Sequence, residues 1–190
     1  ASSHGLKQNR LDGLKFNLGI FTNLSQDHLD YHKDLRAYLK AKLYLFENLI
    51  KKKGSVITDE DIPQFKKIKK VTKNNNLKLC TINEKKNNLK ILFHGFRGDS
   101  QILDVEHNKS VTKIKLNLIG KIQLKNLLMA IIAAKKSNLD FKKILSVLSK
   151  INPVEGRLEK IGRLKNKSKV ILDYAHTPDA LKTCLLNLKE

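Results

Sequence analysis

The sequence predicts an α/β fold, in which a mostly parallel sheet with helices is accompanied by a small β-meander. Two patterns lead to this class. Over residues 1–82, short apolar strands alternate with segments whose apolar residues recur every three or four positions, as in helices that pack on one face. Residues 89–118 then change to a period of two, which indicates about three antiparallel strands.

The first strand is expected at residues 17–24, and a helix follows over 35–50. The apolar residues of this helix form one face toward a core, and Lys42 lies on that face. Lys42 therefore either extends its stem out of the core or points into a pocket at the edge of it. A neutral amine in such a pocket can act as a nucleophile or add carbon dioxide. The apolar residues of the face are Leu35, Tyr38, Leu39, Leu45, Phe46 and Leu49.

The next elements continue the alternation. A strand over 54–59 ends at an acidic turn, and Pro63 begins a helix over 62–71. A further strand is expected at 77–82. Strands separated by helices in this way favour a parallel sheet.

The meander over 89–118 is expected to turn at 95–99 and at 107–109. Two helices follow, over 123–136 and 141–150. The first of them is rich in Ala, Ile and Leu, so we predict that it is buried.

The segment Asn-Pro-Val-Glu-Gly at 152–156 breaks the pattern and marks a domain boundary. We therefore divide the chain into a first domain at 1–153 and a second at 154–190. A strand over 157–163 is expected to open the second domain.

A second strand over 169–174 is followed by a helix over 178–188, with Thr177 as N-cap and Pro178 as first helical residue. Residues 173–176 therefore form a strand-to-helix turn. In a parallel sheet such a turn lies at the carboxyl edge, where ligands bind. A bare helix start would explain the two capping residues, but not the acid and the histidine of the turn.

The net charge of +20 would suit a protein that binds nucleic acid through its phosphates. The excess is nearly all lysine, however, and it is spread along the chain with asparagine and isoleucine, as expected of solvated surface. We therefore expect no nucleic-acid partner and keep a basic nucleic-acid-binding protein as an alternative. The arginines are Arg10, Arg36, Arg97, Arg157 and Arg163.

No apolar segment approaches the roughly 20 residues that a membrane-spanning helix needs. The first residues lack the basic head and apolar centre of a signal peptide. Cys80 and Cys184 stand far apart, which indicates neither a disulfide framework nor a zinc knuckle. A cytoplasmic protein without a membrane partner is expected.

Residues 27–32 hold two histidines and two aspartates directly after the first strand. The loop after a strand end is where α/β enzymes hold metals and phosphates. His28 and His32 are four positions apart, as in some zinc sites, but no acidic partner at zinc-protease spacing accompanies them. The loop is therefore predicted to bind a metal or a phosphate.

Five segments, in this order along the chain, resemble the successive signatures of the Mur ligases, a family that uses ATP to form amide bonds. The likeness is greatest to the MurE type, which adds the third peptide residue to UDP-N-acetylmuramoyl-L-alanyl-D-glutamate. The Asp-Tyr-Ala-His-Thr-Pro form separates this type from the other Mur ligases. The segments extend over nearly the whole chain, at 2–10, 21–32, 38–42, 156–159 and 173–181.

The resemblance implies a magnesium site. Lys42 matches the lysine that such ligases carbamylate, which turns its amine into a carboxylate that helps to hold Mg²⁺. His28 matches a ligand of the same ion, among oxygens and waters. Asp27 and Asp30 lie nearby and are expected to orient the loop.

It also implies binding residues for both substrates. Ser2, Gln8 and Arg10 match residues that contact the UDP-muramoyl dipeptide, an anion that suits an arginine fork. Asn126 matches an asparagine that contacts the adenine of ATP. Gln123 stands where the family usually has a second asparagine, which puts that contact in doubt.

In the second domain, Arg157 and Asp173 match residues that reach the phosphates and ribose of ATP, and His176 lies in the same turn. The implied reaction proceeds through an acyl phosphate and adds meso-diaminopimelate, or alternatively lysine. A monomer is expected. A folylpolyglutamate-synthase-like ligase of the same superfamily is a second alternative.

The implied architecture is a central ATPase-type domain over 1–153, incomplete at its N-terminus, and the truncated start of a Rossmann-like C-terminal domain over 154–190. No phosphate-binding Gly-x-x-x-x-Gly-Lys-Ser/Thr loop occurs in the sequence. We therefore predict that the 190-residue piece alone neither hydrolyses ATP nor ligates amino acids. Clear ATP-dependent ligation in a turnover assay of this piece would contradict the prediction.

Overall fold

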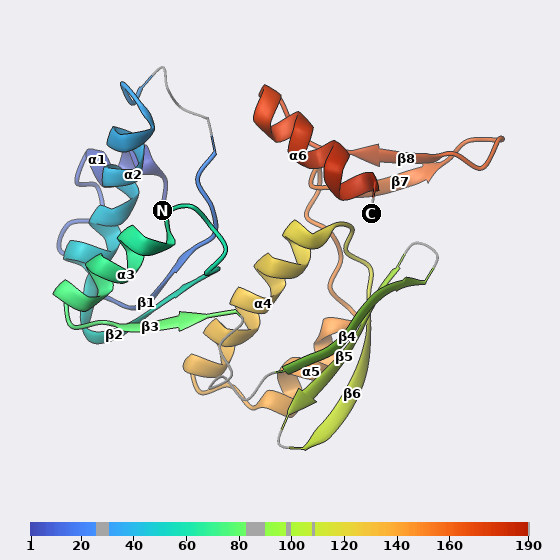
Figure 1. The fold of residues 1–190 in the computed structure, drawn as a ribbon, viewed down its shortest axis with the longest axis horizontal. Helices are drawn as coiled ribbons and strands as arrows, with labels where there is room; N and C mark the ends of the chain where they lie inside the picture. The colour runs from blue at the N-terminus through green and yellow to red at the C-terminus, as the bar shows by residue number, and fades with distance from the viewer. Residues whose placement is uncertain (26–30, 83–89, 98–99, 108, 190) are drawn as a thin grey trace. The chain divides into compact units, whose positions relative to one another are not determined.

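The chain forms two compact units, residues 1–84 and 85–190, each built from both helices and strands. This mixed α/β architecture, seen in the computed structural model, confirms the predicted fold class (Figure 1). None of the described helices has the length and apolar content needed to cross a membrane. The structure describes residues 1–25, 31–82, 90–97, 100–107 and 109–189.

A parallel sheet of three strands, in the order β1–β2–β3, is the base of the first unit. The register of β1 against β2 is irregular between Phe16 and Leu18. Beside this irregularity the backbones come so close that a Cβ on Gly54 would lie 2.9 Å from the carbonyl oxygen of Asn17, so only glycine fits there. The elements are α1 (Ser3–Lys7), β1 (Phe16–Phe21), α2 (Leu35–Tyr44), η1 (Leu45–Leu49), β2 (Ile50–Thr58), α3 (Phe65–Asn74) and β3 (Lys78–Thr81).

The predicted helix over 35–50 is present as α2 followed by one π-helical turn, η1. Asp34 begins it, because its Oδ1 accepts a hydrogen bond from the backbone N–H of Ala37 at 2.7 Å. The π-helical turn ends at Leu49, and the chain continues directly into β2.

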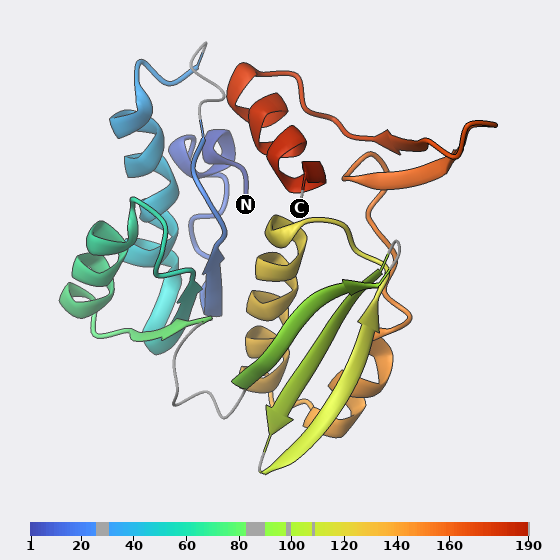
Figure 2. The same ribbon diagram turned by 45° about the vertical axis from the view of Figure 1, so that its right-hand side comes forward.

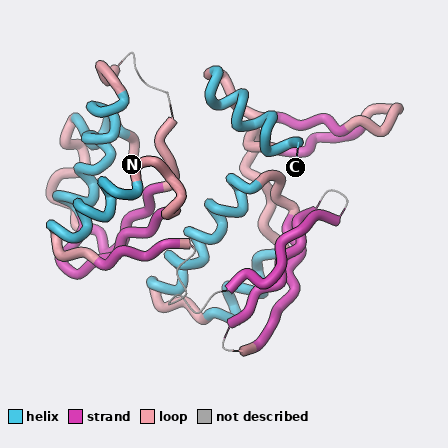
Figure 3. The backbone as a smooth tube through the Cα atoms, in the orientation of Figure 1, coloured by secondary structure: helices cyan, strands magenta, loops and turns pink. Residues whose placement is uncertain are grey.

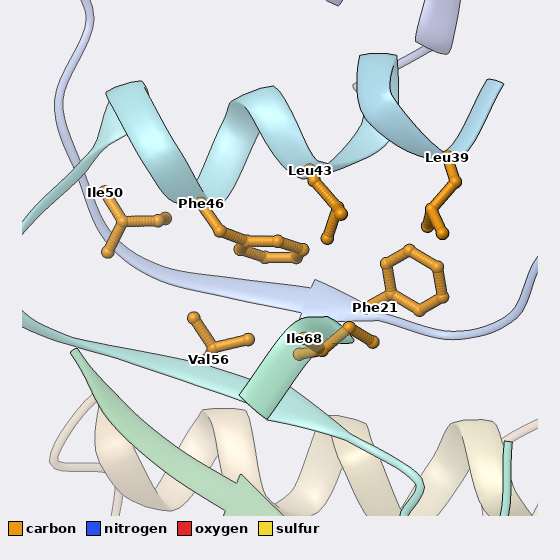
Figure 4. Close-up of a cluster of buried hydrophobic side chains, with 7 residues drawn as sticks. All are labelled: Phe21, Leu39, Leu43, Phe46, Ile50, Val56 and Ile68. Carbon is orange, nitrogen blue, oxygen red and sulfur yellow. The ribbon is translucent and has the colours of Figure 1, made fainter. Parts of the chain in front are cut away.

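Seven buried apolar side chains join these helices to the sheet (Figure 4). The rings of Phe21 and Phe46 lie 6.3 Å apart between β1 and η1. Ile68 of α3 is fully buried in the same cluster. Since β1, β2, α2, η1 and α3 all contribute buried side chains to this cluster, the packing determines which face of α2 turns inward. The cluster consists of Phe21, Leu39, Leu43, Phe46, Ile50, Val56 and Ile68.

The second unit begins with the predicted meander, an antiparallel sheet in the order β4–β5–β6. Helices α4 and α5 lie along one face of it (Figures 1 and 2). Leu103 and Val105 of β5 are buried, as are Ile114 and Leu116 of β6, in agreement with the period of two. The elements are β4 (Lys90–Arg97), β5 (Ser100–His107), β6 (Ser110–Leu116), α4 (Lys121–Lys136) and α5 (Phe141–Leu148).

A hairpin of β7 (Glu159–Arg163) and β8 (Lys169–Leu172), followed by α6 (Pro178–Lys189), completes this unit (Figure 3). The two strands and the helix were all predicted. The strands β7 and β8 pair antiparallel, whereas the turn after the second strand had been predicted at the edge of a parallel sheet. Thr177 caps α6 as expected, since its Oγ1 accepts from the N–H of Ala180 at 3.2 Å.

Two predictions about element starts were wrong. β2 begins at Ile50 rather than at residue 54, because the segment after η1 already pairs with β1. Pro63 lies in the turn before α3, which begins at Phe65. The domain boundary predicted between residues 153 and 154 stays a prediction.

Leu39→Ala should lower the free energy of unfolding of the first unit by about 2–4 kcal/mol, because it leaves a cavity in the core cluster. Leu39 is 5% exposed, whereas Leu14 of the same unit is 50% exposed, so Leu14→Ala is the matched control. We expect the control to change stability by less than about 0.5 kcal/mol. Denaturant unfolding of both variants provides the measurement, and equal effects would contradict the assignment of the core.

Candidate functional site

The three residues predicted to contact the UDP-linked substrate surround α1. Ser2 caps this helix, because its Oγ accepts a hydrogen bond from the N–H of Gly5 at 3.1 Å. Gln8 is the C-cap, and both it and Arg10 are exposed. A Cβ placed on Gly5 would lie 3.2 Å from Ser2 Oγ and 4.0 Å from Arg10 Cδ. Ser2 and Arg10 therefore flank Gly5 and are open to solvent.

The segment after Arg10, at residues 12–15, is held against α2 and η1 by polar contacts. The hydroxyl of Tyr44 donates to the carboxylate of Asp12, with distances of 2.8 and 3.0 Å to its two oxygens. This hydrogen bond, with a smaller contribution from burial, raises the pKa of the Tyr44 phenol. Lys15 Nζ donates to the carbonyl of Asn48 at 2.6 Å.

Lys42 lies at the edge of the packed face of α2. Its side chain is half-buried, and its Nζ is 5.0 Å from the centre of the Tyr38 ring, which is itself buried. An ammonium over an aromatic ring is stabilised by the negative face of the ring. The lysine therefore lies at the edge of the core-facing side of α2, where its position in the sequence placed it.

The other predicted ligands of the metal, His28 with Asp27 and Asp30 beside it, lie outside the described residues. Within the described ranges, no three His, Cys, Asp or Glu side chains gather as they would around a metal ion. Of the residues predicted to form the magnesium site, the structure therefore describes the position of Lys42.

Four aromatic rings, those of His4, Tyr31, His32 and Tyr38, gather between α1 and α2, and we call them the ring cluster. His32 is completely buried, and its Nε2 is 3.0 Å from Ser3 Oγ. Its ring stacks on that of Tyr38, with centroids 4.9 Å apart and planes inclined by 15°. It meets the ring of Tyr31 edge-on at 5.0 Å. Sequence reasoning had considered His32 only as a zinc ligand and had missed this partner.

Asp173 organises the turn before α6 with both of its carboxylate oxygens. One accepts from the backbone N–H of Leu158 and the other from that of Ala175, each at 2.9 Å. The N–H of Tyr174 donates to the carbonyl of Gly156 at 2.8 Å. Two of these hydrogen bonds join the turn to the segment that precedes β7, and the third, from Ala175, closes the turn itself.

Three of the predicted ATP residues come together in this junction. The guanidinium of Arg157 lies 5.6 Å from the centre of the Tyr174 ring. The ring of His176 meets the same ring at 5.0 Å, and its Nδ1 is 2.9 Å from the Tyr174 carbonyl. Asp173 directly precedes Tyr174 in the sequence. Tyr174 is 67% exposed, so Arg157 and His176 flank an open aromatic surface.

Helix α4 connects to the same junction through its first turn. Gln123 Nε2 donates to the carbonyl of Arg157 at 3.1 Å. Asn126, the predicted adenine contact, is half-buried and lies three residues further along the helix. Asn187 of α6 accepts from the N–H of Ile122 at 3.1 Å. Gln123, which departs from the family's usual asparagine, therefore has a structural partner of its own.

The cavity between α4 and α5 does not coincide with these residues. Its volume is about 300 Å³, and its lining is apolar, with Leu127, Ile131, Ile144 and Leu148 among the side chains that form it. None of the predicted ATP residues lines it.

The sequence profile described as Mur ligase middle domain matches residues 1–134. UDP-N-acetylmuramoyl-L-alanyl-D-glutamate--2,6-diaminopimelate ligases from Rickettsia typhi and Rickettsia prowazekii are each 38% identical to this chain over 189 residues. The alignments cover all of this chain but only 37% and 38% of those relatives. The chain belongs to the Mur ligase family, as its motifs indicated.

Solved structures agree with this assignment. A ligase of the same name superposes on the whole chain with a TM-score of 0.77 at 30% identity, over 39% of its own length. MurF from Acinetobacter baumannii is 16% identical, with a TM-score of 0.73 over 90% of this chain and 37% of its own. The apo form of L. casei FPGS is 20% identical, with a TM-score of 0.67 over 97% of this chain and 48% of its own. The last two share the fold.

Asp173→Asn should loosen the junction, because an amide side chain offers only one oxygen in place of the two acceptors used here. A hydrogen bond to a charged group contributes about 1.5–3 kcal/mol, so amide exchange at Leu158 or Ala175 should accelerate by about tenfold or more. Hydrogen exchange followed by NMR measures this. Glu155→Gln, at an exposed acid of the same segment, is the control. Unchanged exchange at both amides would count against the described geometry.

Proposed function

We propose that this chain is part of an ATP-dependent ligase that joins a diamino acid to UDP-N-acetylmuramoyl-L-alanyl-D-glutamate. The observation that carries the proposal is that the whole chain aligns with relatives named for that activity. These relatives are 35–38% identical to it over 189 residues. Meso-diaminopimelate is the proposed amino acid, with lysine as the alternative. The enzyme is proposed to act as a monomer in the cytoplasm, where ATP and UDP-linked sugars are available.

The substrate is proposed to bind beside α1. Arg10 supplies a guanidinium fork, which suits a carboxylate or a phosphate. Ser2 and Gln8 add neutral polar groups at the two ends of the helix. The exposure of Gln8 and Arg10, and the closeness of both Ser2 and Arg10 to Gly5, support this assignment.

Lys42 and His28 are proposed to hold Mg²⁺, with Lys42 carbamylated. An amine is a poor partner for this hard cation, but a carbamate oxygen fits its preference for oxygen ligands. The position of Lys42 supports the assignment, because α2 packs against the sheet and holds this half-buried lysine at a defined place. When bound, the ion would neutralise charge on the phosphates.

Arg157, Asp173 and His176 are proposed to contact ATP, with Asn126 at the adenine. Arg157 and His176 are exposed and can approach phosphate oxygens. Asp173 holds the turn that carries His176 and bonds the backbone N–H of Leu158, next to Arg157, so its contribution includes the orientation of both residues.

The chemistry would proceed in two steps. The glutamate carboxylate of the substrate attacks the γ-phosphorus of ATP, which releases ADP and leaves an acyl phosphate. The amine of the diamino acid then attacks the acyl carbon, so the C–N bond forms, the C–O bond breaks and inorganic phosphate leaves. Cationic groups lower the barrier because charge develops on the transferring phosphoryl group.

A folylpolyglutamate-type ligase would share this fold and this chemistry, but it would use a folate. The complete enzyme should therefore form product with UDP-N-acetylmuramoyl-L-alanyl-D-glutamate, ATP, Mg²⁺ and a diamino acid, and none with a folate. Product analysis by mass spectrometry distinguishes the two, and ligation of the folate alone would overturn the proposal.

Lys42→Ala in the complete enzyme should abolish turnover, and added bicarbonate should not restore it, because no amine remains to be carbamylated. Lys40→Ala is the matched control, since Lys40 is an exposed residue of the same helix. Phosphate release gives the rate, and ¹³C NMR with labelled bicarbonate detects the carbamate independently of activity. Full activity of the Lys42 variant, or a carbamate signal that persists in it, would refute the assigned role.

A further inference from the structure

We infer that His32 is a positioning residue of the ligase, which holds the substrate-binding helix α1 at a fixed place against the Lys42 helix α2. The inference rests on the proposed function, because it concerns the residues that this function assigns to the substrate. Four contacts within the first unit carry it.

The first contact is the hydrogen bond between His32 Nε2 and Ser3 Oγ, at 3.0 Å. His32 and Ser3 are 0% and 3% exposed, so water does not compete for this bond. Hydrogen bonds in a medium of low dielectric are strong, and the loss of one partner leaves the other unsatisfied. The bond therefore resists any displacement of α1.

The second and third contacts determine the orientation of the imidazole. Its face lies on the Tyr38 ring, and its neighbour Tyr31 meets it at 88°. Stacked and edge-to-face rings are both favourable arrangements. Because they restrict the ring from two perpendicular directions, Nε2 stays aimed at Ser3.

The fourth contact continues the path to the predicted catalytic lysine, since Lys42 Nζ lies 5.0 Å from the centre of the Tyr38 ring. At the other end, Ser3 follows Ser2, whose Oγ caps α1. One chain of contacts therefore leads from Ser2 and Ser3 through His32 and Tyr38 to Lys42.

A packing role alone would not require histidine here. Phenylalanine would fill a similar space and would keep both ring contacts, but it has no atom that can bond to Ser3. Glutamine would give up the ring contacts, yet its side-chain amide can reach a similar position. These two substitutions therefore separate the hydrogen bond from the packing.

The test measures steady-state kinetics of the complete ligase. His32→Phe and Ser3→Ala should each raise KM for the UDP-linked dipeptide about tenfold, as expected for one lost hydrogen bond, with KM for ATP changed less than about twofold. The double variant should be no worse than either single one, because both remove the same bond. His32→Gln should restore KM to within about threefold of the unmodified enzyme.

His94→Phe is the matched control, since His94 Nε2 also has a side-chain partner, Gln101 Oε1 at 2.8 Å, but in the second unit. It should leave KM for the dipeptide unchanged. If the unmodified enzyme ligates the dipeptide but His32→Phe and Ser3→Ala leave its KM unchanged, or if their effects add, the role of His32 is overturned alone. If the unmodified enzyme does not ligate the dipeptide at all, the proposed function fails, and the role of His32 with it.

Discussion

The first unit depends on the burial of one face of α2 and η1 against the parallel strands. Phe46 and Leu43 turn toward Phe21 and Val56, and this packing fixes the rotation of the helix about its axis. Lys42 therefore comes to the rim of the core, half-buried and with its Nζ close to the Tyr38 ring.

The junction of the second unit is held together in another way. Helix α6 buries none of its residues, and the turn before it is attached through hydrogen bonds of Asp173 and of the Tyr174 backbone. Regions with few buried apolar contacts open at a lower free energy than a packed core does. Arg157, Asp173 and His176 therefore lie in a part of the chain held mainly by hydrogen bonds, whereas Asn126 and Lys42 lie on helices that bury apolar side chains.

Many of the helices and strands could be predicted because their apolar residues recur at regular spacings within each element. Apolar residues at spacings of three and four gave the helices, and the period of two gave the meander. The errors came where tertiary contacts override local signals. Pro63 is a favourable helix start that lies in a turn, and β2 begins early because pairing with β1 extends it to Ile50. The environment of His32 had no local signal, because Ser3 is 29 positions away.

The amino-acid sequence by itself determined the family, the order of the elements and the identity of the residues proposed to act. Motif residues and periodicity are local properties, so they can be recognised without coordinates. The tertiary structure alone decided which of those residues share an environment. It joined His32 to Ser3, and Asp173 to an amide 15 positions away, and it stacked His32 on the Tyr38 ring of α2. Contacts of this kind arise when separate elements bury their apolar faces together, and no pattern within a single element contains them.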